Sequence, residues 1–303
     1  MRKLTIRPGA VWLDTAGKPI QAHGGGILLH DGMYYWFGEN KEAPNNPGTT
    51  RVDVIGVGCY SSRNLVDWKN EGVVLPAGEG DLHPSGVLER PKVVYNRTTR
   101  QFVMWMHIDS ADYRMAAAGV AVSDRATGPY RYLGSCSPNG NESRDMTVFQ
   151  DSDGRAYLVH SSDKNSVIVI ADLTDDYLRP TGHYTRHFDH QVPNGGRESP
   201  ALFKHDGKYF IITSGCTGWL PNAAQYAVAD SIHGPWAVKG NPCNSETTFD
   251  SQNTFVLALG DRFVFMADRW NKNNLRDSRY VWLPLEVEGK SLRLQWWDRW
   301  EIA

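Results

Sequence analysis

Apolar and polar residues alternate in five segments of the chain, and a short turn interrupts each segment in the middle. Two alternating runs around a turn are typical of a β-hairpin, because successive side chains of a strand point to opposite faces. Three of the turns contain Asp-Gly, the strongest short-range hairpin signal. The segments begin at His23, Glu89, Asp145, Glu198 and Gln252, so successive starts are 66, 56, 53 and 54 residues apart.

A second apolar unit recurs between these hairpins and supplies two further strands to each repeat. These units occupy residues 56–62, 119–124, 168–172, 226–230 and 280–284. A period of this length with four strands is typical of propeller blades. The pattern therefore predicts an all-β fold, a five-bladed β-propeller with four-stranded blades, as one domain over residues 1–303. A β-sandwich is the alternative, but it does not predict the four-strand period.

Composition narrows the classes of function. The chain has 303 residues, 41% hydrophobic and 22% charged, with a net charge of -2, which is typical of a soluble globular protein. Nothing strongly basic indicates nucleic acid as a partner. Eleven Trp and 13 Tyr suggest surfaces that stack on sugar rings, although aromatic residues also fill cores.

The sequence predicts neither a metal nor a cofactor. Its four cysteines form no C-x-x-C pair, and we interpret them as free or buried thiols: Cys59, Cys136, Cys216 and Cys243. The ten histidines include no H-x-x-x-H pair on a predicted helix. Residues 151–154 resemble the start of a calcium loop but lack the Glu at its twelfth position, so we predict a hairpin turn there.

No apolar run is long enough for a signal peptide at the N-terminus or for a membrane-spanning helix. We therefore expect no membrane partner. We expect a cytoplasmic protein, or a secreted or periplasmic one if a leader has been removed. The oligomeric state is left open.

Polar residues occupy the first position of every predicted inner strand: His23, Glu89, Asp145, Glu198 and Gln252. Inner strands line the axis of a propeller, so these five side chains are expected to converge at one mouth of the channel. A purely structural role would predict Gly, Asn, Ser or Asp at the start of a strand. Glu occupies this position twice, which favours a functional role. The adjacent residues Arg90, Arg144 and Arg197 are expected at least to neutralise charge.

Clustered carboxylates in a concave site drive their pKa values apart, which keeps one of them protonated near neutral pH. Glycoside hydrolysis needs such an acid and a second group that activates water, roughly 6.5 to 9.5 Å away in inverting enzymes. Side chains from different blades can meet that spacing across an axial pocket. The ring therefore favours glycosidase chemistry on an oligo- or polysaccharide.

Two of the inner strands resemble motifs of glycoside hydrolase family 43, and the resemblance covers the whole chain. The motifs are Asp145-Met-Thr-Val-Phe149 and Arg197-Glu-Ser-Pro-Ala201. The resemblance implies that Glu198 is the general acid and that Asp145 tunes its pKa. The family usually places its base, an Asp, on the first inner strand, but here that place is His23-Gly-Gly-Gly26.

The exo-β-1,3-galactanase branch shares this departure, and it resembles the chain at residues 35–39, 88–91, 113, 119–122 and 249–252. The resemblance implies that Gln252 handles the water through its imidic tautomer, because a neutral amide is a poor base. Glu89 is the alternative base. The resemblance also implies a substrate-binding set, to which His23 is added: Glu39, Glu89, Tyr113, Thr217 and Trp219.

The predicted activity is inverting, exo-acting release of galactose from β-1,3-galactan, such as the backbone of arabinogalactan. An α-L-arabinofuranosidase or a β-xylosidase is an alternative, although both normally need the missing Asp. A non-catalytic sugar-binding propeller is another, favoured by the absent base and opposed by the retained Glu198 and Asp145. Each binding residue also has a structural alternative: Tyr113 and Trp219 as rim aromatics without a ligand, Glu39 as a solvated hairpin end, and Gln252 as a hydrogen-bonding spacer only.

Overall fold

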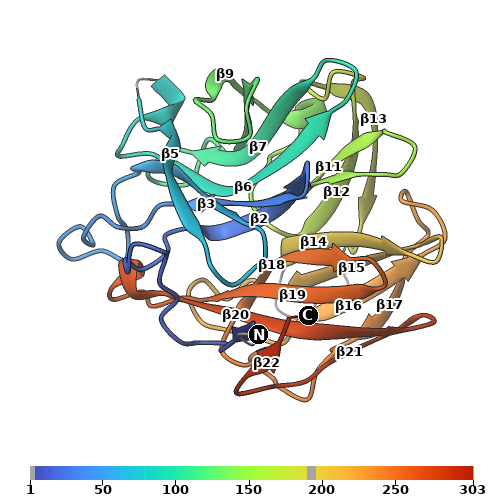
Figure 1. Cartoon of the computed structure of the whole chain (residues 1–303). Helices are drawn as coiled ribbons and strands as arrows, with labels where there is room; N and C mark the ends of the chain where they lie inside the picture. Colours follow the sequence, from blue (N-terminus) through green and yellow to red (C-terminus); the bar gives the residue numbers. More distant parts are fainter. Residues whose placement is uncertain (1–3, 79, 190–195, 303) are drawn as a thin grey trace.

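The computed structural model describes residues 4–78, 80–189 and 196–302. Within these residues the chain forms five four-stranded antiparallel sheets, and the strand order in each sheet follows the chain (Figure 1). Three short 3-10 turns lie between strands: η1 (Gly80–Leu82), η2 (Pro138–Gly140) and η3 (Leu275–Asp277). The predicted five-bladed β-propeller is confirmed.

Each blade consists of four consecutive strands. Blade 1 contains β2 (His23–His30), β3 (Met33–Glu39), β4 (Gly56–Ser62) and β5 (Lys69–Pro76), and blade 2 contains β6 (Val87–Asn96), β7 (Gln101–Asp109), β8 (Ala117–Ser123) and β9 (Arg131–Cys136). Blade 3 contains β10 (Met146–Gln150), β11 (Ala156–Ser162), β12 (Val167–Leu173) and β13 (Pro180–His187). Blade 4 contains β14 (Glu198–His205), β15 (Lys208–Ser214), β16 (Gln225–Ala229) and β17 (Ala237–Gly240). Blade 5 contains β18 (Gln252–Leu259), β19 (Arg262–Arg269), β20 (Arg279–Glu288) and β21 (Ser291–Leu294).

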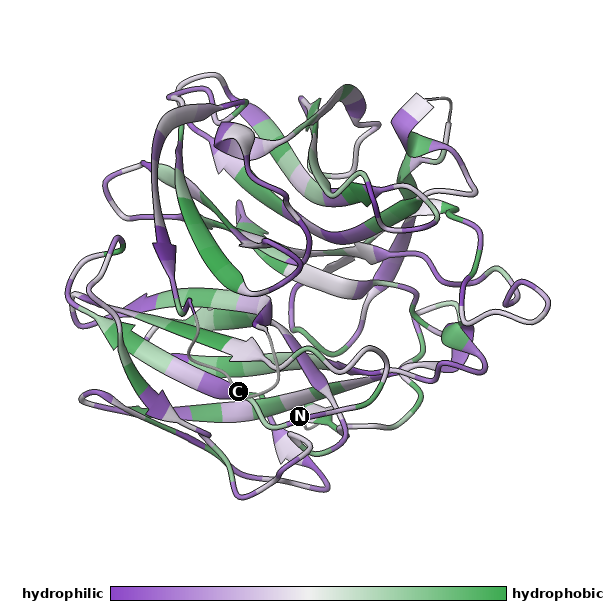
Figure 2. Ribbon diagram, turned by 180° about the vertical axis from the view of Figure 1, so that it is seen from behind, coloured by the Kyte–Doolittle hydropathy of each residue, from purple (hydrophilic) through white to green (hydrophobic). Residues whose placement is uncertain are grey.

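Alternate residues along a strand point to opposite faces of the blade, and each face packs against a different neighbouring blade. On β3, Trp36 packs in the cluster shared with blade 5, while the next residue, Phe37, packs in the cluster shared with blade 2. On β19, Phe265 and Met266 face blades 4 and 1 in the same alternating way. Hydrophobic colouring therefore runs along the strands in Figure 2.

The two ends of the described chain meet. Strand β1 (Thr5–Ile6) pairs with β22 (Trp300–Glu301), and Ile6 and Ile302 pack into the cluster between blades 1 and 5. The N and C labels accordingly lie close together in Figure 1. The contact between the two chain ends therefore lies where the first blade meets the last, and it holds the ring closed there.

A β-bulge opens the inner strands of blades 1, 2 and 4 directly after the residue predicted to face the axis. The pairing register shifts by one residue after His23, Glu89 and Glu198. The residue that follows is left-handed each time, with φ of 59° at Gly24, 56° at Arg90 and 55° at Ser199. A bulge re-aims the neighbouring side chains, and Glu89 and Glu198, which precede two of these bulges, face the axial mouth.

Other features follow the sequence closely. The Asp31-Gly32 hairpin has φ of 49° and 72°, as a type I′ turn requires. The predicted turn at residues 151–154 joins β10 to β11 and is confirmed. All four cysteines are free, and Cys59 and Cys243 are buried. No helix in the described part of the chain has the length and apolar character needed to cross a membrane.

Candidate active site

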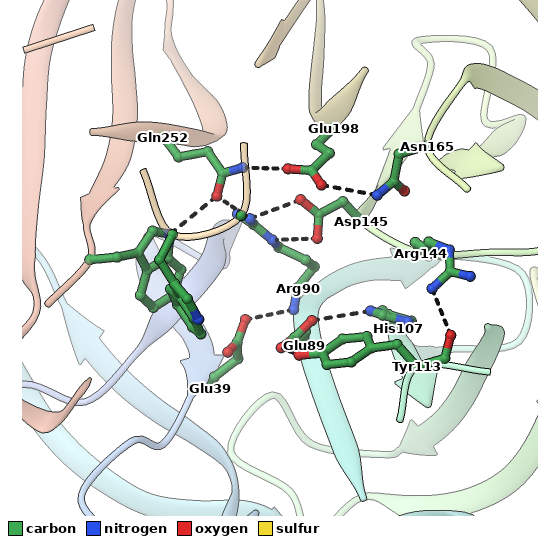
Figure 3. A pocket seen from close by; sticks show the side chains of 13 residues that line it. Glu39, Glu89, Arg90, His107, Tyr113, Arg144, Asp145, Asn165, Glu198 and Gln252 are labelled. Atoms are coloured by element: carbon green, nitrogen blue, oxygen red, sulfur yellow. Dashed lines mark hydrogen bonds and ion pairs between the residues drawn. The ribbon is translucent and has the colours of Figure 1, made fainter. Parts of the chain in front are cut away.

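A cavity of about 360 Å³ lies at the axial mouth where the bulged inner strands begin (Figure 3). Seven of the nine residues predicted for the site line it: Glu39, Glu89, Tyr113, Asp145, Glu198, Trp219 and Gln252. They come from all five blades and the loop after β15. Four of the five side chains expected to converge at one mouth of the channel do so, namely Glu89, Asp145, Glu198 and Gln252, and the expectation is wrong for His23.

The other two predicted residues do not line the cavity. His23 is fully buried, because its Nδ1 lies 2.9 Å from Asp268 Oδ1 and its ring stacks on Tyr280. Thr217 is exposed, and its hydroxyl donates to the carbonyl of Leu220 within its own loop. His23 therefore supports the floor of the site, and Thr217 shapes the loop that carries Trp219.

Arg90 crosses the middle of the pocket (Figure 3). Its guanidinium binds Asp145 through Nε at 3.0 Å and Nη2 at 2.9 Å, and Nη2 also donates to Gln252 Oε1 at 2.6 Å. Its backbone N–H donates to Glu39 Oε1 at 2.9 Å. One residue thus ties together side chains from blades 1, 2, 3 and 5, and the left-handed bulge makes this reach possible.

Glu198 has the environment of a general acid. Burial, together with the charge of Asp145, raises the pKa of the Glu198 carboxyl to about 7. Three groups donate to it: Asn165 Nδ2 at 2.9 Å and Cys216 Sγ at 2.9 Å to Oε1, and Gln252 Nε2 at 3.2 Å to Oε2. A carboxyl of this kind holds a proton near neutral pH and can release it to a leaving oxygen.

Glu89 has the opposite character. Burial alone would raise its pKa, but the hydrogen bond from His107 and the charge of Lys41 outweigh burial and lower the pKa to about 2. His107 Nδ1 lies 3.3 Å from Oε2, and the Tyr113 hydroxyl donates to Oε1 at 2.8 Å. Asp109 binds the other ring nitrogen of His107 at 3.0 Å, and the two carboxylates raise the pKa of His107 to about 9. Glu89 is therefore an ionised carboxylate held by a cationic imidazole.

Glu39 and Gln252 complete the ring. Glu39 is buried beside Lys41, whose ammonium lies 2.7 Å from Oε2, and burial raises the pKa of Glu39. Gln252 has its amide fully engaged: Oε1 accepts from Arg90 and from Trp270 Nε1 at 3.1 Å, and Nε2 also donates to Ser214 at 3.0 Å. Its oxygen therefore faces two groups that can only donate.

Sequence reasoning missed several lining residues: Arg90, His107, Arg144, Asn165, Gly218 and Trp270. Arg90 was noted only as a neutralising neighbour of Glu89. His107 could have been found from register, because it pairs with Glu89 across the bulged hairpin. Asn165 lies in the loop between β11 and β12, and Trp270 lies in the loop after β19. No local sequence motif identifies either of them as a pocket residue.

Three donor atoms of Glu89, His107 and Asp145 lie within 4.8 Å of one another, the spacing of metal ligands. The two carboxylates already have cationic partners: Asp145 has the Arg90 guanidinium, and Glu89 has a His107 ring whose pKa is raised to about 9. A metal ligand must be deprotonated, so a protonated His107 fits a hydrogen-bonding role and not a metal site.

The family model of the glycosyl hydrolases family 43 matches residues 26–261. The chain belongs to this family. Among characterised relatives, a β-D-galactofuranosidase of Aspergillus niger is 30% identical over 268 residues, which are 77% of this chain and 77% of the relative.

Solved structures of family 43 members agree with the fold. A β-1,3-galactosidase of the family, solved with galactodeoxynojirimycin, is 40% identical and superposes with a TM-score of 0.91 over 98% of this chain and 100% of its own. An exo-β-1,3-galactanase from Phanerochaete chrysosporium, solved as a Glu-to-Ala variant with β-1,3-galactotriose, is 38% identical with a TM-score of 0.91. That match covers 99% of this chain and 68% of the fungal one.

Proposed function

We propose that this family 43 chain is an inverting, exo-acting glycoside hydrolase that releases terminal galactose from β-1,3-galactan, such as the backbone of arabinogalactan. The observation that supports the reaction is one axial pocket that holds a protonated carboxyl and an ionised carboxylate, Glu198 and Glu89. The sugar is inferred from the similar proteins, whose names specify β-1,3-galactosidase and exo-β-1,3-galactanase activity.

Glu198 is the general acid that protonates the leaving oxygen. Asp145 tunes it, because a neighbouring negative charge opposes ionisation of the Glu198 carboxyl. Arg90 binds Asp145 through two nitrogens and holds this carboxylate in place beside the acid. The carboxyl is thus kept ready for proton donation near neutral pH, as general acid catalysis requires.

Glu89 is the stronger candidate for the group that activates water. It carries a negative charge at neutral pH, and Figure 3 places it across Arg90 from Glu198. Gln252 is a neutral amide whose Nε2 lies only 3.2 Å from Glu198, whereas the acid and base of an inverting enzyme need roughly 6.5 to 9.5 Å between them. In this arrangement Gln252 orients Glu198 and Arg90, and its role as an imidic base is the alternative.

The remaining predicted residues that line the pocket bind the terminal sugar. Glu39 and Tyr113 offer hydrogen-bonding groups to its hydroxyls from blades 1 and 2. Trp219 stands edge-on to Trp270 with ring centroids 5.6 Å apart, and its Nε1 donates to Thr50 Oγ1 at 2.9 Å. Two locked indole rings beside a polar pocket are suited to pack against the face of a sugar ring.

The deciding experiment is digestion of β-1,3-galactotriose, with products followed by chromatography and the anomer of the released sugar followed by proton NMR at early times. Stepwise release of α-galactose supports the proposal, and initial release of β-galactose contradicts inversion. A β-galactofuranoside, an α-arabinofuranoside and a β-xyloside are run in parallel, and preference for one of them would overturn the galactan assignment. Binding of galactotriose without any release would favour the sugar-binding alternative.

A further inference from the structure

Two histidines and an aspartate meet at the junction of blades 3 and 4, outside the axial pocket. Asp172 lies on β12, His183 on β13, and His233 in the turn between β16 and β17. His183 Nδ1 is 3.0 Å from Asp172 Oδ2, and His233 Nε2 is 2.6 Å from Asp172 Oδ1. The two imidazole rings stand edge to face, with centroids 4.6 Å apart.

Local backbone irregularities produce this meeting. Ala171 pairs with Tyr184 and Leu173 pairs with Pro180, so three residues of β13 lie opposite Asp172 alone. Gly182, within this bulge, has φ of 100°, a conformation that favours glycine. A bulge bends the strand and re-aims its side chains, and here it brings His183 and Asp172 to the same side of the sheet.

A second layer of polar groups holds His233. Thr185 Oγ1 lies 2.9 Å from His233 Nδ1 and 2.8 Å from His187 Nε2. Thr185 thus links the two imidazoles, and its contact with His233 Nδ1 orients the ring so that Nε2 faces Asp172.

We propose that Asp172, His183 and His233 form a binding site for a divalent transition metal ion of the zinc type. Imidazole and carboxylate ligands suit Zn²⁺, and the three donor atoms lie within 4.8 Å of one another. Tetrahedral Zn²⁺ with bonds of about 2.0 to 2.2 Å needs its ligands about 3.3 Å apart. The separations of 3.0 Å to His183 and 2.6 Å to His233 must therefore open by about 0.3 and about 0.7 Å, and water takes the fourth position.

The surroundings favour a metal here more than in the axial pocket. The ion pairs that Asp172 makes among the described residues are those with the two histidines. In the pocket, cations already bind three of the carboxylates: Lys41 binds Glu39, Arg90 binds Asp145 and His107 binds Glu89. Thr185 supplies the second-layer contact that orients a ligating imidazole.

The site lies over the apolar junction between two blades. His233 packs its ring against Tyr157, with centroids 5.8 Å apart, and Tyr157 belongs to the cluster that buries blade 3 against blade 4. A metal held by Asp172 and His183 on one blade and His233 on the next cross-links the ring. Binding to the folded state alone raises the unfolding temperature by mass action.

The test is calorimetric titration of ZnCl2 into the metal-free full chain without a polyhistidine tag. We expect one Zn²⁺ per chain and no comparable heat from CaCl2, because Ca²⁺ prefers a cage of oxygen ligands. His183→Ala and Asp172→Asn are expected to weaken binding at least about 100-fold, and Thr185→Val about tenfold. His205→Ala is the matched control, because His205 lies 3.4 Å from Asp206 in a pair that includes no second histidine.

His183→Ala should fold normally, since 63% of that side chain is exposed. Zinc should raise the unfolding temperature of the wild type and of His205→Ala but not of His183→Ala, with galactotriose hydrolysis equal in all three. Absence of stoichiometric zinc binding in the wild type would overturn the proposal. Equal zinc affinity in His183→Ala and the wild type would overturn it as well.

Discussion

Blades 2 and 4 each contribute one glutamate to the pocket, and the two glutamates have similar backbone settings but opposite pKa shifts. Glu89 and Glu198 both lie near the start of an inner strand, both precede a bulge, and both are followed by a left-handed residue. The pKa of Glu198 is raised to about 7, whereas that of Glu89 is lowered to about 2.

The partners across the hairpin explain the difference. Glu198 pairs with Ser214 and has Asp145 as a charged neighbour, and among the described residues it forms no ion pair with a cation. Glu89 pairs with His107, which Asp109 keeps cationic. The same backbone device thus yields an acid or a carboxylate, depending on one neighbouring side chain.

The largest effect is expected from Glu198→Gln, which keeps the shape of the acid and removes its proton. The turnover number on galactotriose should fall by about 10³-fold, within the range for general acid catalysis. Hydrolysis of a dinitrophenyl β-galactoside should fall far less, because that leaving group needs no proton. The variant should be more stable than the wild type at pH 8, since a carboxyl with a raised pKa destabilises the fold once it ionises. A loss that is equal for both substrates would remove Glu198 from the acid role.

Removal of the opposite carboxylate should have the next largest effect. Glu89→Ala should lower turnover by about 10²-fold or more, because the water then has no charged acceptor. Added azide should replace the water and give α-galactosyl azide, detected by mass spectrometry and NMR. Gln252→Ala should cost less, about tenfold, because it loosens Arg90 and Glu198 without removing a charge. If the order of these two variants is reversed, Gln252 is the base.

The smallest effect concerns the pH dependence of kcat/KM. Glu198 must be protonated, so activity should fall as the pH rises above about 7. Glu89 must be ionised, so activity should persist down toward its pKa of about 2, where the stability that this ionised group contributes is also lost. His107→Gln removes the cation beside Glu89 and should move the acidic limb upward by about one pH unit, leaving the basic limb in place. A shift of the basic limb alone would contradict this division of roles.

The stability contribution of His107 has the opposite sign in pH. Its pKa is raised to about 9, so its stabilising contribution is complete below the ordinary value of 6.5 and is lost as the pH rises through 9. The unfolding temperature of the wild type should therefore fall as the pH rises over this range. In His107→Gln that part of the pH dependence should be absent, which separates the stability effect from the catalytic one.

The sequence by itself determined the blades and the membership of most of the pocket. A period of two and regularly spaced turns leave few arrangements for the strands. Counting back from each turn places His23, Glu198 and Gln252 at the first position of their inner strands, whereas Glu89 is the third residue of β6. His23 shows the limit of that reasoning, because its position was predicted correctly but Asp268 and Tyr280 bury its side chain below the pocket.

Only the tertiary structure decided the charge of each group. Arg90 bridges Asp145 and Gln252, which are far from it in the chain, and Asp172 meets His233 across two blades. Such contacts carry no local pattern, because side chains reach them through bulges and loops. Whether a carboxyl is acid or base depends on its burial and on charges a few ångströms away, and those distances exist only after the ring has closed.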